Sequence, residues 1–355
     1  MVVNENGSWC QSMSDPESMK MSLKLGDPVP KPSQPRPEDE IMSGWEGDLD
    51  APLVSVVCVT FNQEKYINEA LDSFLEQQTN FPFEVIVHDD CSTDSAKAVI
   101  EEYVKRYPTI IKPVFQQENQ FSKGKRPTFL ASKYTKGQFI ALCEGDDFWL
   151  SANKLQKQAD FLLANADYSA VTHQTIKFFE DRRSEPQVFT SIEKDHWELD
   201  DLMFGRKYHT ASLMVRGDIF RDNEIPENIV SGDKAISFLL LTFGKIKYLP
   251  EPMAVYRKNS GGISSWVTSD IMTGDLNLLP WLRRINPEFP IKKYESIIHS
   301  TICGYPPSIR VTVAIKHYLL FVIYSFSYFP KNMRPIVGLG KSLLARAFRG
   351  GFSGL

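Results

Sequence analysis

Short apolar runs alternate with segments of helical periodicity through the middle of the chain. The β-branched run 54–60 (V-S-V-V-C-V-T) predicts a buried parallel strand, and apolar residues at helical spacing over 64–77 predict the helix after it. The same pair recurs as a strand at 83–88 and a helix beginning at Asp94 or Ser95, either of which suits an N-cap. This alternation is typical of α/β structures built around a parallel sheet.

The predicted strands end in polar residues. Phe61 and Asn62 follow the first strand, D-D-C-S-T-D (89–94) ends the second, and E-G-D-D (144–147) ends a third at 139–143. Because the carboxyl ends of parallel strands meet at one edge of an open sheet, we expect these residues to lie together. Three such strand ends at one edge predict a binding site.

Asp146 and Asp147 are adjacent carboxylates, with Glu144 close by, where a buried strand reaches the surface. Crowded carboxylates repel one another and stay ionised only when a cation or a set of donors compensates them. Their hard oxygen atoms favour Mg²⁺ or Mn²⁺. The alternative is a solvated turn rich in Asp and Gly. No G-x-G-x-x-G follows any of the strands, which argues against a dinucleotide-binding protein.

Composition indicates how the chain is organised. With 355 residues, 42% of them hydrophobic, it can bury a large core. Residues 1–50 are rich in Ser, Pro and acidic residues and predict a disordered or loosely attached segment, before an α/β domain at 51–266 and a helical, basic region at 267–355. The five cysteines are odd in number and scattered, without a secretory signal, which favours the cytoplasm and argues against a cysteine metal site.

Positive charge is concentrated towards the C-terminal end. Residues 296–355 contain seven Lys or Arg and no Asp or Glu, and since the whole chain has a formal net charge of −4, the residues before them carry −11. This asymmetry suggests an anionic partner such as lipid headgroups or nucleic acid. The uncharged run 317–329 is too short to span a membrane, whereas 336–349 predicts an amphipathic basic helix. That helix fits an anionic membrane surface or a docked terminal helix.

Three motifs in a fixed order resemble those of a known enzyme family. They are P-L-V-S-V-V-C-V-T-F-N-Q-E-K-Y-I (52–67), V-I-V-H-D-D-C-S-T-D (85–94) and G-Q-F-I-A-L-C-E-G-D-D-F-W (137–149), followed by K-L-Q-K-Q-A-D-F-L-L-A-N-A-D-Y (154–168). Over about 52–264 the chain is similar to the family 2 glycosyltransferases of the GT-A fold, especially those that build polysaccharides. The resemblance implies an α/β fold with a Rossmann-like, mostly parallel sheet flanked by helices, to which the C-terminal region adds a helical extension.

The resemblance implies a nucleotide site at the first two strand ends. Thr60 and Phe61 would flank the base, Asp90 would accept a hydrogen bond from it, and Asp89 would orient the turn. Glu64 is grouped with these donor-binding residues.

The resemblance also implies a metal site at the third strand end. Asp147 would bind Mn²⁺ or Mg²⁺ bridging the donor diphosphate, and Asp146 would contact the ribose or share the metal. Glu144 takes the first acidic place of the family's D-x-D motif, where Asp is commoner.

The remaining roles concern proton transfer and the leaving group. Asp233 matches the family's general base, which deprotonates the acceptor hydroxyl, and the local sequence also suits an N-cap before an apolar helix. Arg257 would stabilise the departing diphosphate, and Arg126 would reach it or lie in a solvated loop. His209 would line the acceptor pocket or serve as a buried or capping histidine.

The resemblance therefore implies an inverting glycosyltransferase of surface polysaccharide or lipopolysaccharide synthesis. It would move a sugar from a nucleotide-diphospho-sugar to a saccharide or lipid-linked saccharide acceptor, without nucleic acid, in the cytoplasm or peripherally on the inner face of the cell membrane. The alternatives are a nucleotide-sugar binding or scaffold protein without transfer activity, and a sugar nucleotidylyltransferase, whose Gly-rich loop after the first strand is missing here.

Overall fold

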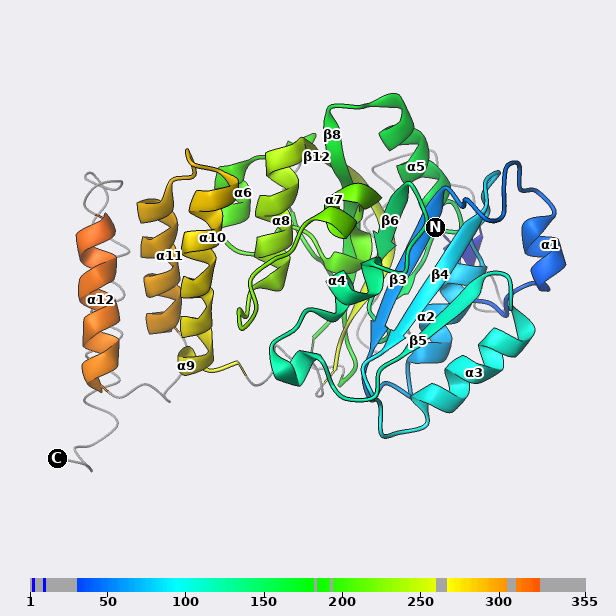
Figure 1. Ribbon diagram of the computed structural model, residues 1–355, viewed down its shortest axis with the longest axis horizontal. Coiled ribbons are helices and arrows are strands. Elements are labelled where there is room, and N and C mark those ends of the chain that lie inside the picture. The colour runs from blue at the N-terminus through cyan, green and yellow to red at the C-terminus, as the bar shows by residue number, and fades with distance from the viewer. Residues whose placement is uncertain are drawn as a thin grey trace. The chain divides into compact units, whose positions relative to one another are not determined.

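The chain divides into two units (Figure 1). The computed structural model describes residues 2–3, 9–10, 31–181, 184–191, 194–259, 267–304 and 311–325. The first unit comprises Met1–Glu198, Arg206–Glu224 and Phe243–Ser260, and the second comprises Leu199–Gly205, Ile225–Thr242 and Gly261–Leu355. The second unit therefore takes two segments from within 51–266, in addition to the C-terminal region expected at 267–355.

A ten-stranded mixed sheet forms the centre of the first unit. Its strands are β3 (Val54–Thr60), β4 (Phe83–Asp89), β5 (Ile111–Phe115), β6 (Phe139–Leu142), β7 (Phe148–Trp149), β8 (Tyr168–Phe179), β9 (Gln187–Val188), β10 (His196–Trp197), β11 (Met214–Arg216) and β12 (Lys245–Lys258). The order is β10-β12-β8-β11-β6-β3-β4-β5, with β7 paired to β12 and β9 to β8. A separate pair, β1 (Val2–Val3) and β2 (Trp9–Cys10), is antiparallel.

The parallel half of the sheet confirms the predicted α/β fold. β3 pairs in parallel with β4 and β6, and β4 with β5. β3 has the predicted bounds, while β4 is one residue longer and β6 one residue shorter than expected. The short strand β11 lies in the stretch 209–216, which resembles the family's acceptor-side strand, and it links β6 and β8 in antiparallel pairing. Three residues carry too little periodicity to predict that pairing.

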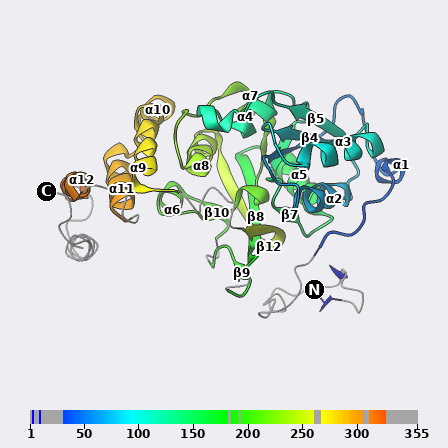
Figure 2. The ribbon, with the colours of Figure 1, turned by 90° about the horizontal axis from the view of Figure 1, so that it is seen from below.

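Helices cover both faces of this sheet (Figure 2). The helices of the first unit are α1 (Glu38–Met42), α2 (Ile67–Leu75), α3 (Ala96–Arg106), α4 (Pro127–Ser132), α5 (Lys154–Ala164) and α7 (Gly217–Asp222), with 3-10 turns η2 (Phe121–Lys123) and η3 (Thr210–Ser212). Apolar residues of α2, α3 and α5 pack with Val54, Val56 and Cys58 of β3. On α4 and α7, Phe129 and Phe220 stack with ring centroids 4.7 Å apart.

Two segments differ from the predicted boundaries. The helix expected at 64–77 begins at Ile67, because a turn in which Tyr66 N donates to Gln63 O precedes it. Part of the segment expected to be disordered or loosely attached is packed on the first unit. There α1 buries Ile41, and Glu38 Oε1 accepts hydrogen bonds from Thr109 N at 2.7 Å and Ile110 N at 2.9 Å.

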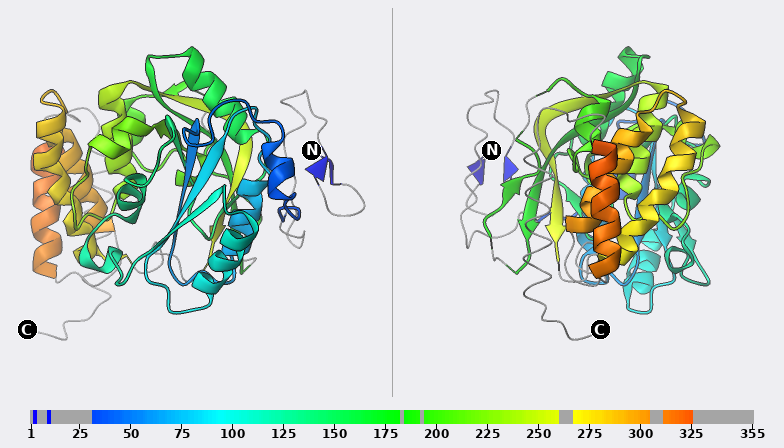
Figure 3. Two further views of the ribbon diagram at one scale, coloured as in Figure 1. Left: turned by 45° about the vertical axis from the view of Figure 1, so that its right-hand side comes forward. Right: turned by 90° about the vertical axis from the view of Figure 1, so that its left-hand side faces the viewer.

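The second unit is helical, as the sequence predicted for the C-terminal region (Figure 3). Its elements are α6 (Leu199–Met203), α8 (Gly232–Phe243), α9 (Ser269–Met272), η5 (Thr273–Asn277), α10 (Leu278–Ile285), α11 (Ile291–Gly304) and α12 (Val311–Ser325). Edge-on contacts among Phe238, Phe289 and Tyr294 join α8 to α11. The helices in the described ranges are all too short or too polar to cross a membrane. The amphipathic helix predicted at 336–349 lies outside the described residues.

Candidate active site

Hydrogen bonds between backbone and side chains tie the ends of β3 and β4 together. Asp90 N donates to Thr60 O at 2.9 Å, Asn62 N donates to Ser92 Oγ at 2.9 Å, and Thr93 N donates to Asn62 Oδ1 at 2.7 Å. Thr60 is buried within this network. Phe61 is 43% exposed and presents its ring at the surface of the strand end.

The carboxylates at the end of β4 accept hydrogen bonds from backbone N–H groups. Asp89 accepts from Ser92 N at 3.2 Å, which supports its expected role in orienting the turn. Asp90 is buried, with Oδ1 2.8 Å from Gln120 N and Oδ2 2.9 Å from Phe121 N. The Asp90 carboxylate thus already holds the η2 turn. The hydrogen bond expected between Asp90 and the nucleotide base stays a prediction.

Hydrogen bonds join the segment around Glu64 to the segment around Asp94. Glu64 N donates to Asp94 Oδ2 at 2.9 Å, and Ser95 N donates to Glu64 Oε2 at 2.8 Å. Hydrogen bonding from Ser95 lowers the pKa of the Glu64 carboxyl. Glu64 therefore helps to fix the loop before α3, and its expected donor contact is also untested.

The acidic turn after β6 is pressed against the end of β3. Gly145 N donates to Val59 O at 2.9 Å, and a Cβ at Gly145 would lie 2.8 Å from Thr60 Oγ1 and 2.9 Å from Thr60 Cβ. Only glycine fits this approach without displacing Thr60. Asp147 N donates to Glu144 O at 3.1 Å, so the turn closes with the two acidic side chains near each other.

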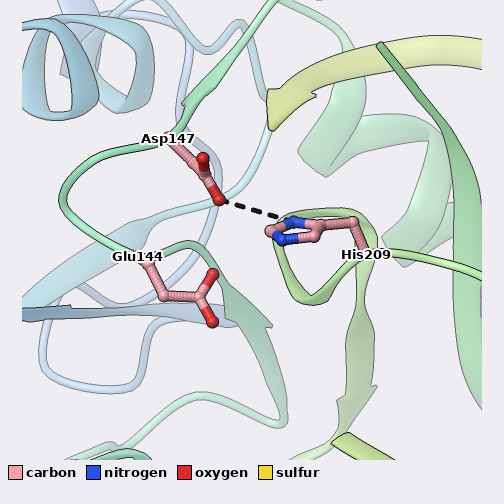
Figure 4. A group of neighbouring side chains, drawn as sticks. All are labelled: Glu144, Asp147 and His209. Carbon is pink, nitrogen blue, oxygen red and sulfur yellow. Dashed lines mark ion pairs between the residues drawn. The ribbon is translucent and has the colours of Figure 1, made fainter. Parts of the chain in front are cut away.

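Glu144, Asp147 and His209 form a cluster with the composition of a metal site (Figure 4). One ligand atom from each side chain lies within 4.8 Å of the others, and Asp147 Oδ2 is 3.4 Å from His209 Nδ1. Carboxylate oxygen and imidazole nitrogen together suit Mn²⁺ and similar divalent ions. The sequence identified Asp147 for this role but paired it with Asp146, which does not belong to this group.

Burial and mutual repulsion perturb the three carboxyl groups of the turn. Burial raises the pKa of Glu144 to about 7, and the charge of Asp146 adds to the shift. Burial also raises the pKa of Asp147 well above its ordinary value, with Asp146 and Glu144 contributing. Glu144 Oε2 is buried without a hydrogen-bond partner among the described residues. A cation at this position would relieve both the repulsion and the missing partner.

His209 contributes a neutral imidazole ring to the cluster. Its Nδ1 accepts a hydrogen bond from Ala211 N at 3.3 Å, and burial lowers its pKa so that the ring is neutral. Because an accepting Nδ1 carries no proton, it does not donate a hydrogen bond to Asp147 Oδ2. The ring also stacks on Tyr256 with centroids 4.0 Å apart, which fixes its orientation.

A buried polar network holds the η3 turn that carries His209. Trp149 Nε1 donates to Ala211 O at 3.0 Å, and Gln158 Nε2 donates to Ser212 O at 2.9 Å. Gln158 in turn accepts from the fully buried Lys154 at 2.8 Å, and burial lowers the pKa of Lys154 to about 7. The residues just after the acidic turn therefore also position the histidine.

Arg257 organises the acidic turn from the end of β12. Its backbone N donates to Asp147 Oδ1 at 2.8 Å, and its Nε donates to Asp146 O at 2.9 Å. The guanidinium forms an ion pair with Glu69 and lies over the Tyr66 ring, with Cζ 4.8 Å from the centroid. The sequence predicted a leaving-group contact for Arg257, and the geometry adds a role in fixing the turn.

Asp146 is held apart from the cluster by Asn259, whose Nδ2 donates to Asp146 Oδ2 at 2.9 Å. Arg126 lies at the N-terminus of α4 with its guanidinium 5.9 Å from the Phe121 ring centroid. Asp233 lies in the first turn of α8, in the second unit. The roles expected of Arg126 and Asp233 remain predictions.

His209 is the member of the cluster whose ligand role the sequence did not indicate. It lies 62 residues after Asp147, and metal-ligand spacing gives no signal over such a distance. The only sequence signal was its position in H-T-A-S-L-M-V-R, before the short strand β11.

Known proteins resemble the first unit in sequence. The model for "Glycosyl transferase family 2" matches residues 55–217. TuaG of Bacillus subtilis, named as a candidate teichuronic acid biosynthesis glycosyltransferase, is 32% identical over 230 residues, 63% of this chain and 84% of that protein. The uncharacterized protein Rv1520 of Mycobacterium tuberculosis is 35% identical over 210 residues, 59% of this chain. The chain spans 60% of the length of Rv1520.

Another relative is TarS of Staphylococcus aureus, a poly(ribitol-phosphate) beta-N-acetylglucosaminyltransferase, which is 37% identical over 186 residues, 50% of this chain and 30% of that protein.

Two solved structures share the fold. TarS 1–349 in complex with UDP-GlcNAc has a TM-score of 0.53 and 20% identity, over 79% of this chain and 74% of that chain. The mannosyltransferase PcManGT of Pyrobaculum calidifontis, in complex with GDP-Man and Mn²⁺, has a TM-score of 0.51 and 17% identity, over 90% of this chain and 84% of that chain. At these identities the likeness establishes the fold alone.

Proposed function

The chain belongs to the family 2 glycosyltransferases, and from that premise we propose that it transfers a sugar from a nucleotide-diphospho-sugar to an acceptor hydroxyl with inversion at the anomeric carbon. The observation that carries the proposal is the cluster of Glu144, Asp147 and His209 at the strand edge where Thr60, Phe61 and Asp90 also lie. A strand edge suited to a nucleotide, beside a group of buried and mutually repelling carboxylates, suits a donor that contains a diphosphate.

The residues of the cluster fit a divalent metal ion. Two carboxylates and a neutral imidazole offer three ligand atoms, and the buried Glu144 Oε2 lacks another partner among the described residues. The imidazole favours Mn²⁺ over Mg²⁺, which prefers oxygen ligands alone. A bound ion would act as a Lewis acid towards the diphosphate of the donor. The Mn²⁺ present in the PcManGT complex supports this choice of metal.

In this proposal, side chains beside the metal site hold the nucleotide part of the donor. The exposed ring of Phe61 is available to stack on the nucleotide base, and Asp146, fixed by Asn259, is available to the ribose. Arg257 keeps the acidic turn in place through its backbone N–H while its guanidinium supplies positive charge beside it.

Asp233 is the residue that we assign to the acceptor proton. An inverting displacement needs a base on the side of the sugar away from the leaving diphosphate, to accept the proton of the attacking hydroxyl. Asp233 lies in the first turn of α8, where the helix dipole favours a negatively charged side chain. The family motif around Asp233 supports this role.

The proposed donor is a UDP- or GDP-sugar and the proposed acceptor a growing saccharide or lipid-linked saccharide. The complexes of TarS with UDP-GlcNAc and of PcManGT with GDP-Man support the donor class. The names of TarS and TuaG, both associated with cell-surface polymers, support the acceptor class. Such an enzyme would work in the cytoplasm, with an anionic membrane surface as a further partner.

A donor screen tests the proposal. Thermal unfolding is followed with UDP-, GDP- and dTDP-sugars in the presence of Mn²⁺, because a ligand at about 100 times its Kd stabilises the native state by about 2.7 kcal/mol. One donor class is expected to raise the unfolding temperature, and the Asp147→Asn variant is expected to lose that shift. If no donor raises it, the proposed function is wrong.

Acceptor transfer with the identified donor tests the base. Asp233→Asn is expected to keep donor binding and to lose transfer by about 10²–10⁴-fold. Asp218→Asn, which changes the corresponding first-turn carboxylate of α7, is the matched control and should transfer normally. Donor binding without transfer in the wild-type protein would instead support the alternative, a nucleotide-sugar binding or scaffold protein.

A further inference from the structure

Helix α12 exposes its most apolar face to solvent. Ile315 is 52% exposed, Leu319 54% and Ile323 61%, and their spacing of four residues places them on one side of the helix. Elsewhere in the described residues, exposed large apolar side chains occur singly on a helix, as does Leu163 on α5 at 54%. Three aligned aliphatic side chains are more than the scattered exposure normal for a protein surface.

The opposite face of α12 is buried and partly polar. His317, Phe321 and Ser325, again four residues apart, pack against α11, which lies beside α12 (Figure 3). Ser325 Oγ is 2.7 Å from Ser296 Oγ, and His317 Nδ1 is 2.8 Å from His299 Nδ1. The helix therefore joins its neighbour through hydrogen bonds and turns aliphatic side chains outwards.

This arrangement is the reverse of a helix that faces water. A water-facing helix buries its apolar stripe and exposes polar side chains, whereas helices in a lipid environment associate through small and hydrogen-bonding residues. At 15 residues, α12 is about 22 Å long, short of the roughly 30 Å hydrocarbon core of a bilayer. It is therefore suited to lie along the surface of a membrane rather than across it.

The charge around α12 indicates which kind of surface its apolar face would bind. Lys316 is exposed next to the apolar face, α12 contains no acidic residue, and residues 296–355 contain seven Lys or Arg without one Asp or Glu. A two-fold pairing of this face with a second copy would bring the exposed Lys316 of both copies to one interface. Anionic lipid headgroups instead complement the positive charge.

We propose that the face of α12 formed by Ile315, Leu319 and Ile323 docks the protein on an anionic lipid surface. The side chains enter the boundary between headgroups and acyl chains, and Lys316 remains at headgroup level. The proposal concerns binding alone and stands whether or not the chain transfers a sugar, since it uses residues of α12 outside the cluster of Glu144, Asp147 and His209.

Flotation of the full chain with vesicles tests the proposal. The wild-type protein is expected to float with vesicles of phosphatidylcholine and phosphatidylglycerol, and not with phosphatidylcholine alone. A variant with Ile315→Gln, Leu319→Gln and Ile323→Gln is expected to bind about 100-fold more weakly, from about fivefold for each half-exposed side chain. Leu163→Gln is the matched control, because Leu163 is as exposed as Leu319, and it should bind like the wild type.

Three results would overturn the proposal. The first is a wild-type protein that does not float with the anionic vesicles. The second is a triple variant that binds as tightly as the wild type, which would assign binding to the basic residues alone. The third is a wild-type dimer in light scattering that the triple variant abolishes, which would make a second copy the partner. The substituted side chains are exposed, so unchanged circular dichroism and unfolding temperature are expected to confirm that the variant folds.

Discussion

The two acidic loops at the edge of the sheet treat their carboxylates in opposite ways. After β4, the carboxylates of Asp89 and Asp90 accept hydrogen bonds from backbone N–H groups, and their loop is thereby fixed. After β6, burial and repulsion raise the pKa values of Glu144 and Asp147. A carboxylate whose lone pairs are filled by the protein contributes to the fold, whereas crowded, buried carboxylates with an unpartnered oxygen, as at Glu144 Oε2, are suited to a cation. The two loops therefore differ in purpose although their sequences look alike.

The largest expected effect is that of Asp147→Asn. We expect transfer to fall about 1000-fold, because the amide cannot hold a divalent ion with full charge. Without metal, the same variant should be more stable by about 1–3 kcal/mol, since a buried and repelled carboxyl is removed. Steady-state kinetics with Mn²⁺ and urea unfolding without it measure the two effects. Asp160→Asn, on the exposed side of α5, is the control. If the Asp147→Asn protein is less stable than the wild type without metal, the carboxylates after β6 stabilise the fold as those after β4 do, and the contrast between the two loops is wrong.

Asp90→Asn should lower the stability of the metal-free protein, whereas Asp147→Asn should raise it. The amide can replace only one of the two oxygens that accept from Gln120 N and Phe121 N, so we expect a loss of about 1–3 kcal/mol in the free energy of unfolding. Urea unfolding with and without Mn²⁺ should give the same loss. A loss that appears only with Mn²⁺ would place Asp90 in the metal site instead.

A smaller effect is expected in the pH dependence of metal-free stability. Because the pKa of Glu144 is raised to about 7, the folded state binds a proton that the unfolded state has released, and stability should fall as pH rises from about 5 to about 8. Glu144 is half-buried, so solvent reduces the effect to about 1 kcal/mol. Glu144→Gln should flatten this part of the profile, and so should saturating Mn²⁺. Parallel profiles for the variant and the wild type would contradict the assignment.

Phe61→Ala should change affinity more than stability. The ring is 43% exposed, so its loss is expected to leave the free energy of unfolding within about 0.5 kcal/mol of the wild type. Loss of stacking on the base should weaken nucleotide binding about fivefold, as measured by calorimetry. Unchanged affinity would remove Phe61 from the donor site.

Local patterns predicted the parallel half of the sheet but not all of the site. β3, β4 and β6 are short apolar runs that end at polar residues, so their positions and their shared edge could be read from periodicity. His209 and Arg257 could not be placed in this way, because the contacts that bring them to Asp147 span 62 and 110 residues. The N–H donors that Asp90 satisfies could not be predicted either, since they lie at the start of the η2 turn, 30 and 31 residues further along the chain.

The hydrogen bond from Arg257 N to Asp147 also affects when the site can form during synthesis of the chain. The acidic turn leaves the ribosome more than a hundred residues before its partners on β12, and the ion pair between Glu69 and Arg257 closes a loop of 188 residues. Contacts at such separation form late, after the loop-closure entropy has been overcome. A chain that stops after β11 would thus contain every motif that identifies the family and still lack the strand that holds Asp147 in place.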